Sequence, residues 1–268
     1  GRNGVCGVRA GSRWPHIKDV TEGGYMPFPF YLAHSAALLK KNDFEVELCD
    51  ALAEGIPRDR FIRNVLMKDY ELIIAETSTA SLKNDLEILS CIKKENSIIA
   101  ICGPEVSMRN PEFFEENRFI DCAMIGEYEL TALELAGHIR SKMLFDNIQG
   151  IVYRDSKGKI RLNPPRPLIS NLDELPWPTR ESLPMSEYLD APGDMPLPSV
   201  QMIASRGCPF QCLFCAWPQL MYGGNSYRAR SIKDVVDEME FLVNKLNFKS
   251  VYFDDDTFNI GKKRMLEL

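Results

Sequence analysis

The 268-residue sequence predicts an α/β protein in which two α/β units are joined by a proline-rich connector. Short apolar runs alternate with helical stretches through the first half, the composition then turns rich in proline, and a strand–loop–helix–strand pattern follows. Alternation of this kind is typical of a parallel sheet covered by helices. We expect a Rossmann-like, doubly wound sheet over residues 1–145, a hairpin and connector over 146–198, and the first β/α units of a partial TIM barrel over 199–268.

The elements of the first half follow from apolar spacing. Residues 81–96 place Leu82, Leu86, Leu89 and Ile92 at helical intervals. The expected strands are residues 5–8, 44–50, 71–77, 97–103 and 119–126, and the expected helices are 28–41, 59–68, 81–96, 111–117 and 128–142. The expected core positions of the first helix are Tyr31, Ala33, Ala37 and Leu38. A ligand crevice is expected at the carboxyl ends of the strands.

The second half opens with a hairpin at residues 148–165, which alternates around a turn at 155–158. Residues 163–200 are rich in proline, which predicts an extended, poorly helical connector. A strand at 199–205, a helix at 231–247 and a strand at 249–256 complete the pattern. The expected inward positions of that helix are Val235, Val236, Met239, Leu242 and Val243.

Composition excludes several classes of protein. The net charge of -6, the pI near 5.3 and the absence of a Lys/Arg block argue against binding to nucleic acid. The sequence contains no apolar run of about 18 residues, so it predicts no membrane span, and no secretory leader is evident. Eight cysteines are too few for a disulfide scaffold. Five lie in or beside apolar runs and are expected to be buried, reduced thiols in a cytoplasmic protein: Cys6, Cys49, Cys91, Cys102 and Cys122.

Both ends of the sequence suggest a C-terminally truncated fragment, because it begins without Met and stops inside an expected helix. A complete eight-stranded barrel takes roughly 250 residues, far more than the second unit contains. We expect the 268-residue chain alone to lack catalytic activity.

Three cysteines define the most informative stretch, which we call the cysteine loop (residues 208–216). Cys208, Cys212 and Cys215 are separated by three and then two residues. Thiolates bind soft metals, but structural zinc needs four ligands, and no second pair or nearby histidine follows. A fourth zinc ligand from elsewhere, or a coincidental group of structural cysteines, remains an alternative. Three thiolates can instead ligate a [4Fe–4S] cluster and leave its fourth iron open for a substrate or cofactor.

The string C-P-F-Q-C-L-F-C resembles the signature of radical S-adenosylmethionine (radical SAM) enzymes. The resemblance implies that the three cysteines ligate a catalytic [4Fe–4S] cluster that chelates SAM, and that Phe214 packs near its adenine. Asp254–Asp256 stand where the family contacts the methionine ammonium, and a strand-end carboxylate suits that role. Asp255 or Asp256 is the expected contact; the alternative is a solvated turn.

The order of units resembles radical SAM enzymes that carry an N-terminal cobalamin (B12) domain, including a connector of the form LDELPWPTRE. The cobalamin contacts implied by this resemblance are Gly103, Pro104, Gly126, Glu127 and Glu129. The D-x-H-x-x-G motif of other B12 domains is absent, and neither His16 nor His34 replaces it. Cobalamin without a protein histidine ligand is the consequence. Arg9 and Arg13 either contact the corrin or are surface charges.

The resemblance implies a B12-dependent radical SAM enzyme, foremost a methyltransferase acting on an unactivated carbon or phosphorus. A cyclase or oxidative enzyme without net methylation and a non-catalytic cobalamin-binding module are the alternatives. A methylthiotransferase is disfavoured because the N-terminal domain of that family uses three cysteines for a second cluster, whereas the front cysteines here lie on expected strands or a helix. The implied partners are a small-molecule, lipid or natural-product substrate and an electron donor such as flavodoxin or ferredoxin.

Overall fold

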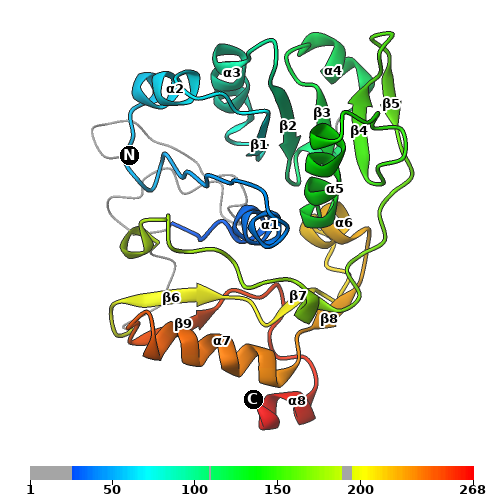
Figure 1. Ribbon diagram of the computed structural model, residues 1–268. Coiled ribbons are helices and arrows are strands. Elements are labelled where there is room, and N and C mark those ends of the chain that lie inside the picture. Colours follow the sequence, from blue (N-terminus) through cyan, green and yellow to red (C-terminus); the bar gives the residue numbers. More distant parts are fainter. Residues whose placement is uncertain (1–25, 109, 189–194) are drawn as a thin grey trace.

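The structure, a computed structural model, describes residues 26–108, 110–188 and 195–268 (Figure 1). Its larger sheet has the order β1-β2-β3-β4-β5. These strands are β1 Leu72–Glu76, β2 Ile98–Cys102, β3 Cys122–Met124, β4 Ile151–Arg154 and β5 Ile160–Leu162. The first three strands run parallel, whereas β4 and β5 form the expected hairpin and continue the sheet antiparallel from β3. The α/β class is therefore confirmed. We call residues 26–162 the front unit.

Helices cover both faces of this sheet. Ala100 and Cys102 face a core shared with α1 (Phe30–Lys41) and α5 (Glu129–Arg140). Ile99 and Ile101 alternate with them and face the opposite core, formed with α3 and α4. The remaining helices of the front unit are α2 Arg58–Leu66, α3 Leu82–Ile92 and α4 Pro111–Glu116, with α2 packed against α3. Coverage on both faces explains why these strands read as nearly continuous apolar runs.

Residues 44–50 do not form the expected strand, so that prediction is wrong. Exposure does alternate along them, with Phe44, Val46 and Leu48 partly buried. Strand formation also requires a neighbouring backbone, and this segment pairs with no strand among the described residues. Its apolar side chains pack instead, Leu48 against the core and Phe44 under the guanidinium of Arg140, 4.1 Å from the ring centroid. The expected first strand, residues 5–8, lies outside the described residues.

The second half forms two smaller sheets. β6 (Ser199–Met202) pairs in parallel with β9 (Ser250–Phe253), and α7 (Ile232–Asn244) packs on this pair. β7 (Ser205–Gly207) pairs antiparallel with β8 (Tyr227–Ala229). The remaining helices are α6 Trp217–Tyr222, α8 Lys262–Glu267 and the 3-10 turns Val106–Met108, Leu172–Glu174 and Met185–Glu187. The larger sheet and the β6–β9 pair lie at opposite ends of the molecule, with α1 and α6 between them (Figure 1).

Some expected core positions are wrong. Val236 and Val243 are 42% and 41% exposed, because the inward face of α7 runs through Val235, Glu238 and Leu242. Because Glu238 is buried, the inward face of α7 differs from the face that the apolar residues alone predict. Ala37 is only partly buried.

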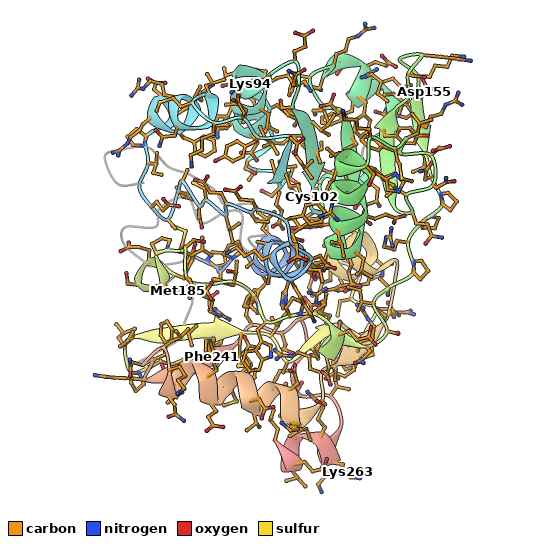
Figure 2. All side chains as sticks on the ribbon, in the orientation of Figure 1. Lys94, Cys102, Asp155, Met185, Phe241 and Lys263 are labelled. Carbon is orange, nitrogen blue, oxygen red and sulfur yellow. The ribbon has the colours of Figure 1, made fainter. Side chains whose placement is uncertain are left out.

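The expected buried thiols divide into two groups. Cys102 and Cys122 are buried, whereas Cys49 and Cys91 are exposed. Figure 2 shows Cys102 in the interior, with Lys94 and Asp155 at the periphery. Cys6 lies outside the described residues.

The connector has no α-helix in its described part, as expected, but it is packed rather than loose. The amide of Thr179 donates to the carbonyl of Ala33 in α1 at 3.1 Å. The indole of Trp177 donates to Asp234 in α7 at 3.0 Å. The connector thus fixes α1 beside α7. No helix in the described ranges combines the length and the apolarity that a membrane crossing requires.

Candidate functional site

The cysteine loop and α6 lie between β7 and β8, so the sheet pairing holds both ends of residues 205–229, which we call the cysteine segment. Gly207, the last residue of β7, has φ +87°. A Cβ at this position would lie 2.0 Å from the carbonyl oxygen of Ser226, so that no other residue fits without backbone movement. Gly207 therefore allows the backbone before the cysteine loop to lie close to the backbone at Ser226.

The three cysteines lie at the surface of this segment. Cys208 is half-buried and accepts a hydrogen bond from Thr257 Oγ1 at 2.9 Å, whereas Cys212 and Cys215 are exposed. Phe214 is 91% exposed. All three thiols are free, and within the described ranges no group of three or more His, Cys, Asp or Glu side chains is arranged to hold a metal ion. The three thiols are thus not gathered around a common centre, and their ligation of an iron–sulfur cluster stays a prediction.

A buried arginine ties the start of the cysteine loop to the front unit. Arg206 in β7 pairs with Glu127 at 3.1 Å and with Glu129 at 2.5 Å, and its side chain is only 2% exposed. Arg228 in β8 pairs with Glu127 at 2.8 Å. Both strands that flank the cysteine loop are therefore held by carboxylates near the start of α5. Buried charges of this kind are tolerated only when they are paired and hydrogen-bonded.

The charges in this network balance, with two arginines against two glutamates. Burial opposes ionisation of Glu127, but the hydrogen bond from Arg228 and the charge of Arg206 outweigh it and lower the pKa of Glu127. Burial raises the pKa of Glu129, which has no exposed surface, against the pull of Arg206. Burial also disfavours the charge of Arg206, yet Glu129, Tyr31 and Glu127 raise its pKa well above the ordinary value. The arginine is charged at every physiological pH.

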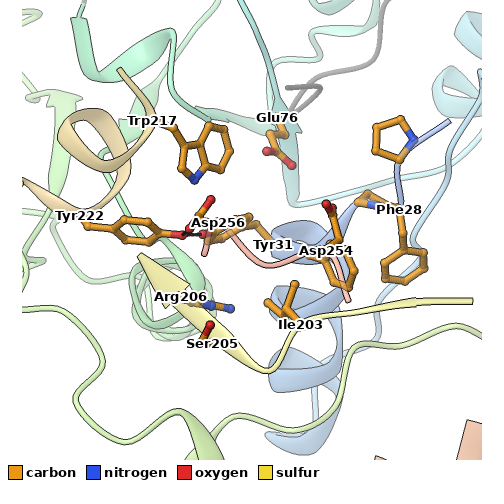
Figure 3. Close-up of a pocket in the computed structure, with 13 residues that line it drawn as sticks. Phe28, Tyr31, Glu76, Ile203, Ser205, Arg206, Trp217, Tyr222, Asp254 and Asp256 are labelled. Carbon is orange, nitrogen blue, oxygen red and sulfur yellow. Dashed lines mark hydrogen bonds between the residues drawn. The ribbon is translucent and has the colours of Figure 1, made fainter. Parts of the chain in front are cut away.

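A pocket lies between the front unit and the cysteine segment (Figure 3). It is lined from the start of α1, the end of β1, β7, α6 and the turn after β9. Carboxylates from Glu76, Asp254 and Asp256 meet aromatic side chains there, among them Tyr31 and Trp217. Such a lining suits a ligand that carries both a positive charge and a flat ring.

The three aspartates after β9 differ in their roles. Asp255 accepts hydrogen bonds from the Ala204 amide at 3.0 Å and from the Ser205 hydroxyl, and burial raises its pKa to about 6. Asp256 accepts from the Gly207 amide at 2.9 Å. Asp254 and Asp256 line the pocket, whereas Asp255 does not. The alternative of a solvated turn is wrong, because Asp254 and Asp255 are buried.

The glycine loops predicted to contact cobalamin lie at the carboxyl ends of the parallel strands. Gly103 has φ +105°, and a Cβ there would lie 2.5 Å from the carbonyl oxygen of Thr77, so the loops after β1 and β2 pack tightly together. The Gly126 amide donates to the Ser107 hydroxyl at 3.5 Å. Pro104 lies next to Gly103 and is partly exposed. Their contact with cobalamin stays a prediction.

Glu127 and Glu129, predicted with those loops, do not line the pocket; their carboxylates face Arg206 and Arg228. His34 is buried in α1, with Nδ1 3.0 Å from the carbonyl oxygen of Pro176. Burial, followed by the charge of Arg206, lowers its pKa. His16, Arg9 and Arg13 lie outside the described residues.

Several residues that the fold brings to the site were not predicted from the sequence, among them Arg206, Tyr31 as a pocket residue, and Tyr222. A signal for Arg206 was present, because an arginine directly after the apolar strand SVQMIAS is unusual unless it is paired inside. Tyr31 was expected only as a core residue; it is buried as expected, and it also lines the pocket. Tyr222 carried no local signal.

Comparison with known proteins gives a consistent set of relatives, although no protein-family model matches the chain. An uncharacterized methyltransferase of Pyrococcus horikoshii is 33% identical over 243 residues, covering 90% of this chain and 51% of its own. The cytidylyl-2-hydroxyethylphosphonate methyltransferase of Streptomyces wedmorensis is 26% identical, over 90% of this chain and 53% of its own. The anaerobic magnesium-protoporphyrin IX monomethyl ester cyclase of Rubrivivax gelatinosus is 25% identical, over 89% and 43%. The chain thus spans about half the length of these relatives.

Two solved structures share the fold. The radical SAM methyltransferase TsrM from Kitasatospora setae, with tryptophan and a SAM analogue bound, superposes with a TM-score of 0.70 at 20% identity. That match covers 88% of this chain and 46% of TsrM. The cobalamin-dependent radical SAM enzyme OxsB, with aqua-cobalamin and SAM bound, gives a TM-score of 0.69 at 21% identity, over 89% of this chain and 33% of OxsB.

Proposed function

We propose that the chain forms the cobalamin-binding unit and the start of the radical SAM barrel of a methyltransferase, because about 90% of it is similar in sequence to two methyltransferases and similar in fold to TsrM and OxsB. The Rossmann-like front unit and the partial barrel belong to this proposal. The substrate is a small molecule or natural product with an unactivated carbon or a phosphorus as acceptor. The electron donor is a flavodoxin or ferredoxin that reaches the exposed cysteine loop.

One observation carries the proposal. Arg206 and Trp217 flank the loop of three free thiols in the sequence, and they line a pocket whose wall also contains carboxylates from the turn after β9 and side chains from the front unit. The pocket therefore lies where a ligand of the cysteine loop and a ligand of the front unit would meet. In a protein with two cofactors, the fold's contribution is to bring their reactive ends together and to exclude water.

The chain's own residues divide the work. Cys208, Cys212 and Cys215 are the cluster ligands, and Phe214 beside Cys215 is the aromatic contact for adenine. Asp256 takes the SAM ammonium, because its carboxylate lines the pocket, and Asp255 anchors β7 from behind. When bound, the cluster and SAM supply a 5′-deoxyadenosyl radical and cobalamin supplies the methyl group.

Cobalamin is assigned to the loops at the carboxyl ends of β1, β2 and β3, around Gly103, Pro104 and Gly126. Glu127 and Glu129 support this surface from the inside through Arg206 and Arg228. The described residues of these loops include no histidine that could ligate cobalt. His34, on α1, contacts the connector through Nδ1.

Anaerobic reconstitution of the full-length protein with iron and sulfide tests the proposal. We expect a [4Fe–4S] cluster, and 5′-deoxyadenosine when SAM and a reductant are added. The triple variant Cys208→Ala/Cys212→Ala/Cys215→Ala should bind no cluster. The double variant Cys49→Ala/Cys91→Ala is the matched control, because it removes two exposed thiols outside the loop and should retain the cluster. A cluster that persists in the triple variant would contradict the proposal.

A cyclase that uses cobalamin without net methylation is the second candidate, favoured by the likeness to the Rubrivivax cyclase. Methyl-labelled SAM separates the two, because only a methyltransferase places the label in its product. A cobalamin-binding module without radical chemistry would bind B12 and release no 5′-deoxyadenosine.

A further inference from the structure

One side chain of the front unit contacts the cysteine segment on both sides of the cysteine loop. The ring of Tyr31 in α1 lies 4.7 Å from the guanidinium carbon of Arg206, two residues before Cys208. Its hydroxyl lies 2.5 Å from the hydroxyl of Tyr222, seven residues after Cys215. Tyr31 therefore reaches the start of the loop through its ring and the end of α6 through its hydroxyl.

The hydrogen bonds of this contact have a defined direction. The Tyr222 hydroxyl donates to Asp256 Oδ2 at 3.0 Å. A phenol has one proton to donate, so the bond between the two hydroxyls is donated by Tyr31 to the oxygen of Tyr222. The Gly207 amide donates to the same oxygen of Asp256 at 2.9 Å. Both ends of the segment thus converge on Asp256, and Tyr31 supports each end.

The surroundings of Tyr31 leave it little freedom. It is 8% exposed and Tyr222 is 6% exposed. Tyr128 packs against the Tyr31 ring with centroids 5.9 Å apart, and Trp217 does so at 6.2 Å. Figure 3 shows Tyr31, Tyr222, Asp256 and Arg206 together on the wall of the pocket. Held on two sides, the Tyr31 ring is a fixed reference point in the front unit.

We propose that Tyr31 is a positioning residue that holds the residues on both sides of the cysteine loop in register with Asp256, and so couples the front unit to the SAM site. This rests on the proposed function, since it presupposes a cluster on the loop and SAM at Asp256. The role is distinct from ligation: Tyr31 acts through Arg206 and Tyr222.

Two matched substitutions test the proposal in the full-length, reconstituted protein. Tyr31→Phe keeps the ring beside Arg206 and removes only the hydroxyl. Tyr188→Phe is the control, because this ring is also buried and its hydroxyl donates to Asp50 at 2.8 Å, outside the pocket and away from the cysteine segment. The readouts are iron bound per protein and the dissociation constant for SAM, taken from the EPR change of the reduced cluster and expressed per cluster.

We expect both variants to bind iron as the wild type does. Tyr31→Phe should weaken SAM binding about fivefold, the usual effect of one lost hydrogen bond, and Tyr188→Phe should leave it unchanged. Loss of folded protein lowers the cluster yield but not the affinity per cluster, so a merely structural role would not produce this pattern. Unchanged affinity in Tyr31→Phe, or an equal loss in both variants, would overturn the inference alone. A wild-type protein that takes up no cluster would overturn the proposed function and this inference with it.

Discussion

The cysteine loop and the strands that flank it are neighbours in sequence and opposites in environment. Within the loop, Leu213 and Phe214 are 105% and 91% exposed. Just before it, Arg206 is 2% exposed and bound to two glutamates of the front unit. The fold therefore uses buried charge to place the ends of the loop and leaves its middle open. Substitutions in the two regions should have very different consequences.

A second network of buried arginine–glutamate pairs joins the connector to α7. Arg180 pairs with Glu238 of α7 at 3.3 Å and lies 4.4 Å from the ring centroid of Phe28. Arg230 pairs with the same glutamate at 2.5 Å. In both networks an arginine from the second half meets an aromatic residue at or just before the start of α1. Contacts made far apart in sequence, not local propensity, fix the two halves beside each other.

The largest loss of stability is expected at Arg206. Arg206→Met leaves Glu127 and Glu129 buried with one cation fewer, and breaking a buried pair typically costs about 3–5 kcal/mol. Urea denaturation of the chain measures this loss in the free energy of unfolding. Arg161→Met, which breaks a half-exposed pair with Asp155, is the control and should cost less than about 1 kcal/mol. Equal losses of stability in the two variants would contradict the difference between the buried Arg206 pairs and a surface pair.

The second prediction concerns pH. The pKa of Asp255 is about 6 in the folded chain against an ordinary 3.8, because of burial. Its folded-state proton stabilises the chain below about pH 4, and this contribution is lost as the pH rises through 6. The stability of the wild type relative to Asp255→Asn should therefore fall by about 2 kcal/mol between pH 4 and 7. Unfolding curves at several pH values measure it; a pH-independent difference would contradict the assignment.

A smaller effect is expected at the boundary between the two regions. Thr257 donates to the sulfur of Cys208 at 2.9 Å. Thr257→Val removes this bond and should lower the free energy of unfolding by about 0.5–1 kcal/mol. In the reconstituted protein it should also make the cluster harder to reduce, since hydrogen bonds to the sulfurs raise the reduction potential. Thr257→Ser keeps the hydroxyl and should match the wild type in redox titration; identical potentials in both variants would contradict this role.

The smallest effect is expected within the loop. Leu213→Ser replaces a fully exposed side chain, so the free energy of unfolding should change by less than about 0.5 kcal/mol. Thermal unfolding is a sufficient measurement. A loss of several kcal/mol would show that the loop middle packs against the fold and would remove the contrast with Arg206.

Local patterns predicted much of the fold. Apolar spacing located all five expected helices of the front unit, the hairpin and the β6–α7–β9 unit. It failed at residues 44–50, where the alternation of a strand is present and a pairing neighbour among the described residues is not. It also failed on α7, where Glu238 occupies an interior position because Arg180 and Arg230 neutralise it. Periodicity reports which face of an element is apolar, but not which partners make a charge acceptable inside.

The sequence by itself determined the three thiols and their spacing, since the chemistry of a donor set is carried by residue types close together in the chain. Only the tertiary structure decided that Glu127 and Glu129 brace Arg206, that Asp256 rather than Asp255 lines the pocket, and that Tyr31 supports the loop at both ends. The physical reason is sequence distance. Arg206 lies 77 and 79 residues from its two carboxylates and Tyr31 lies 191 residues from Tyr222, so neither contact leaves a local pattern to recognise.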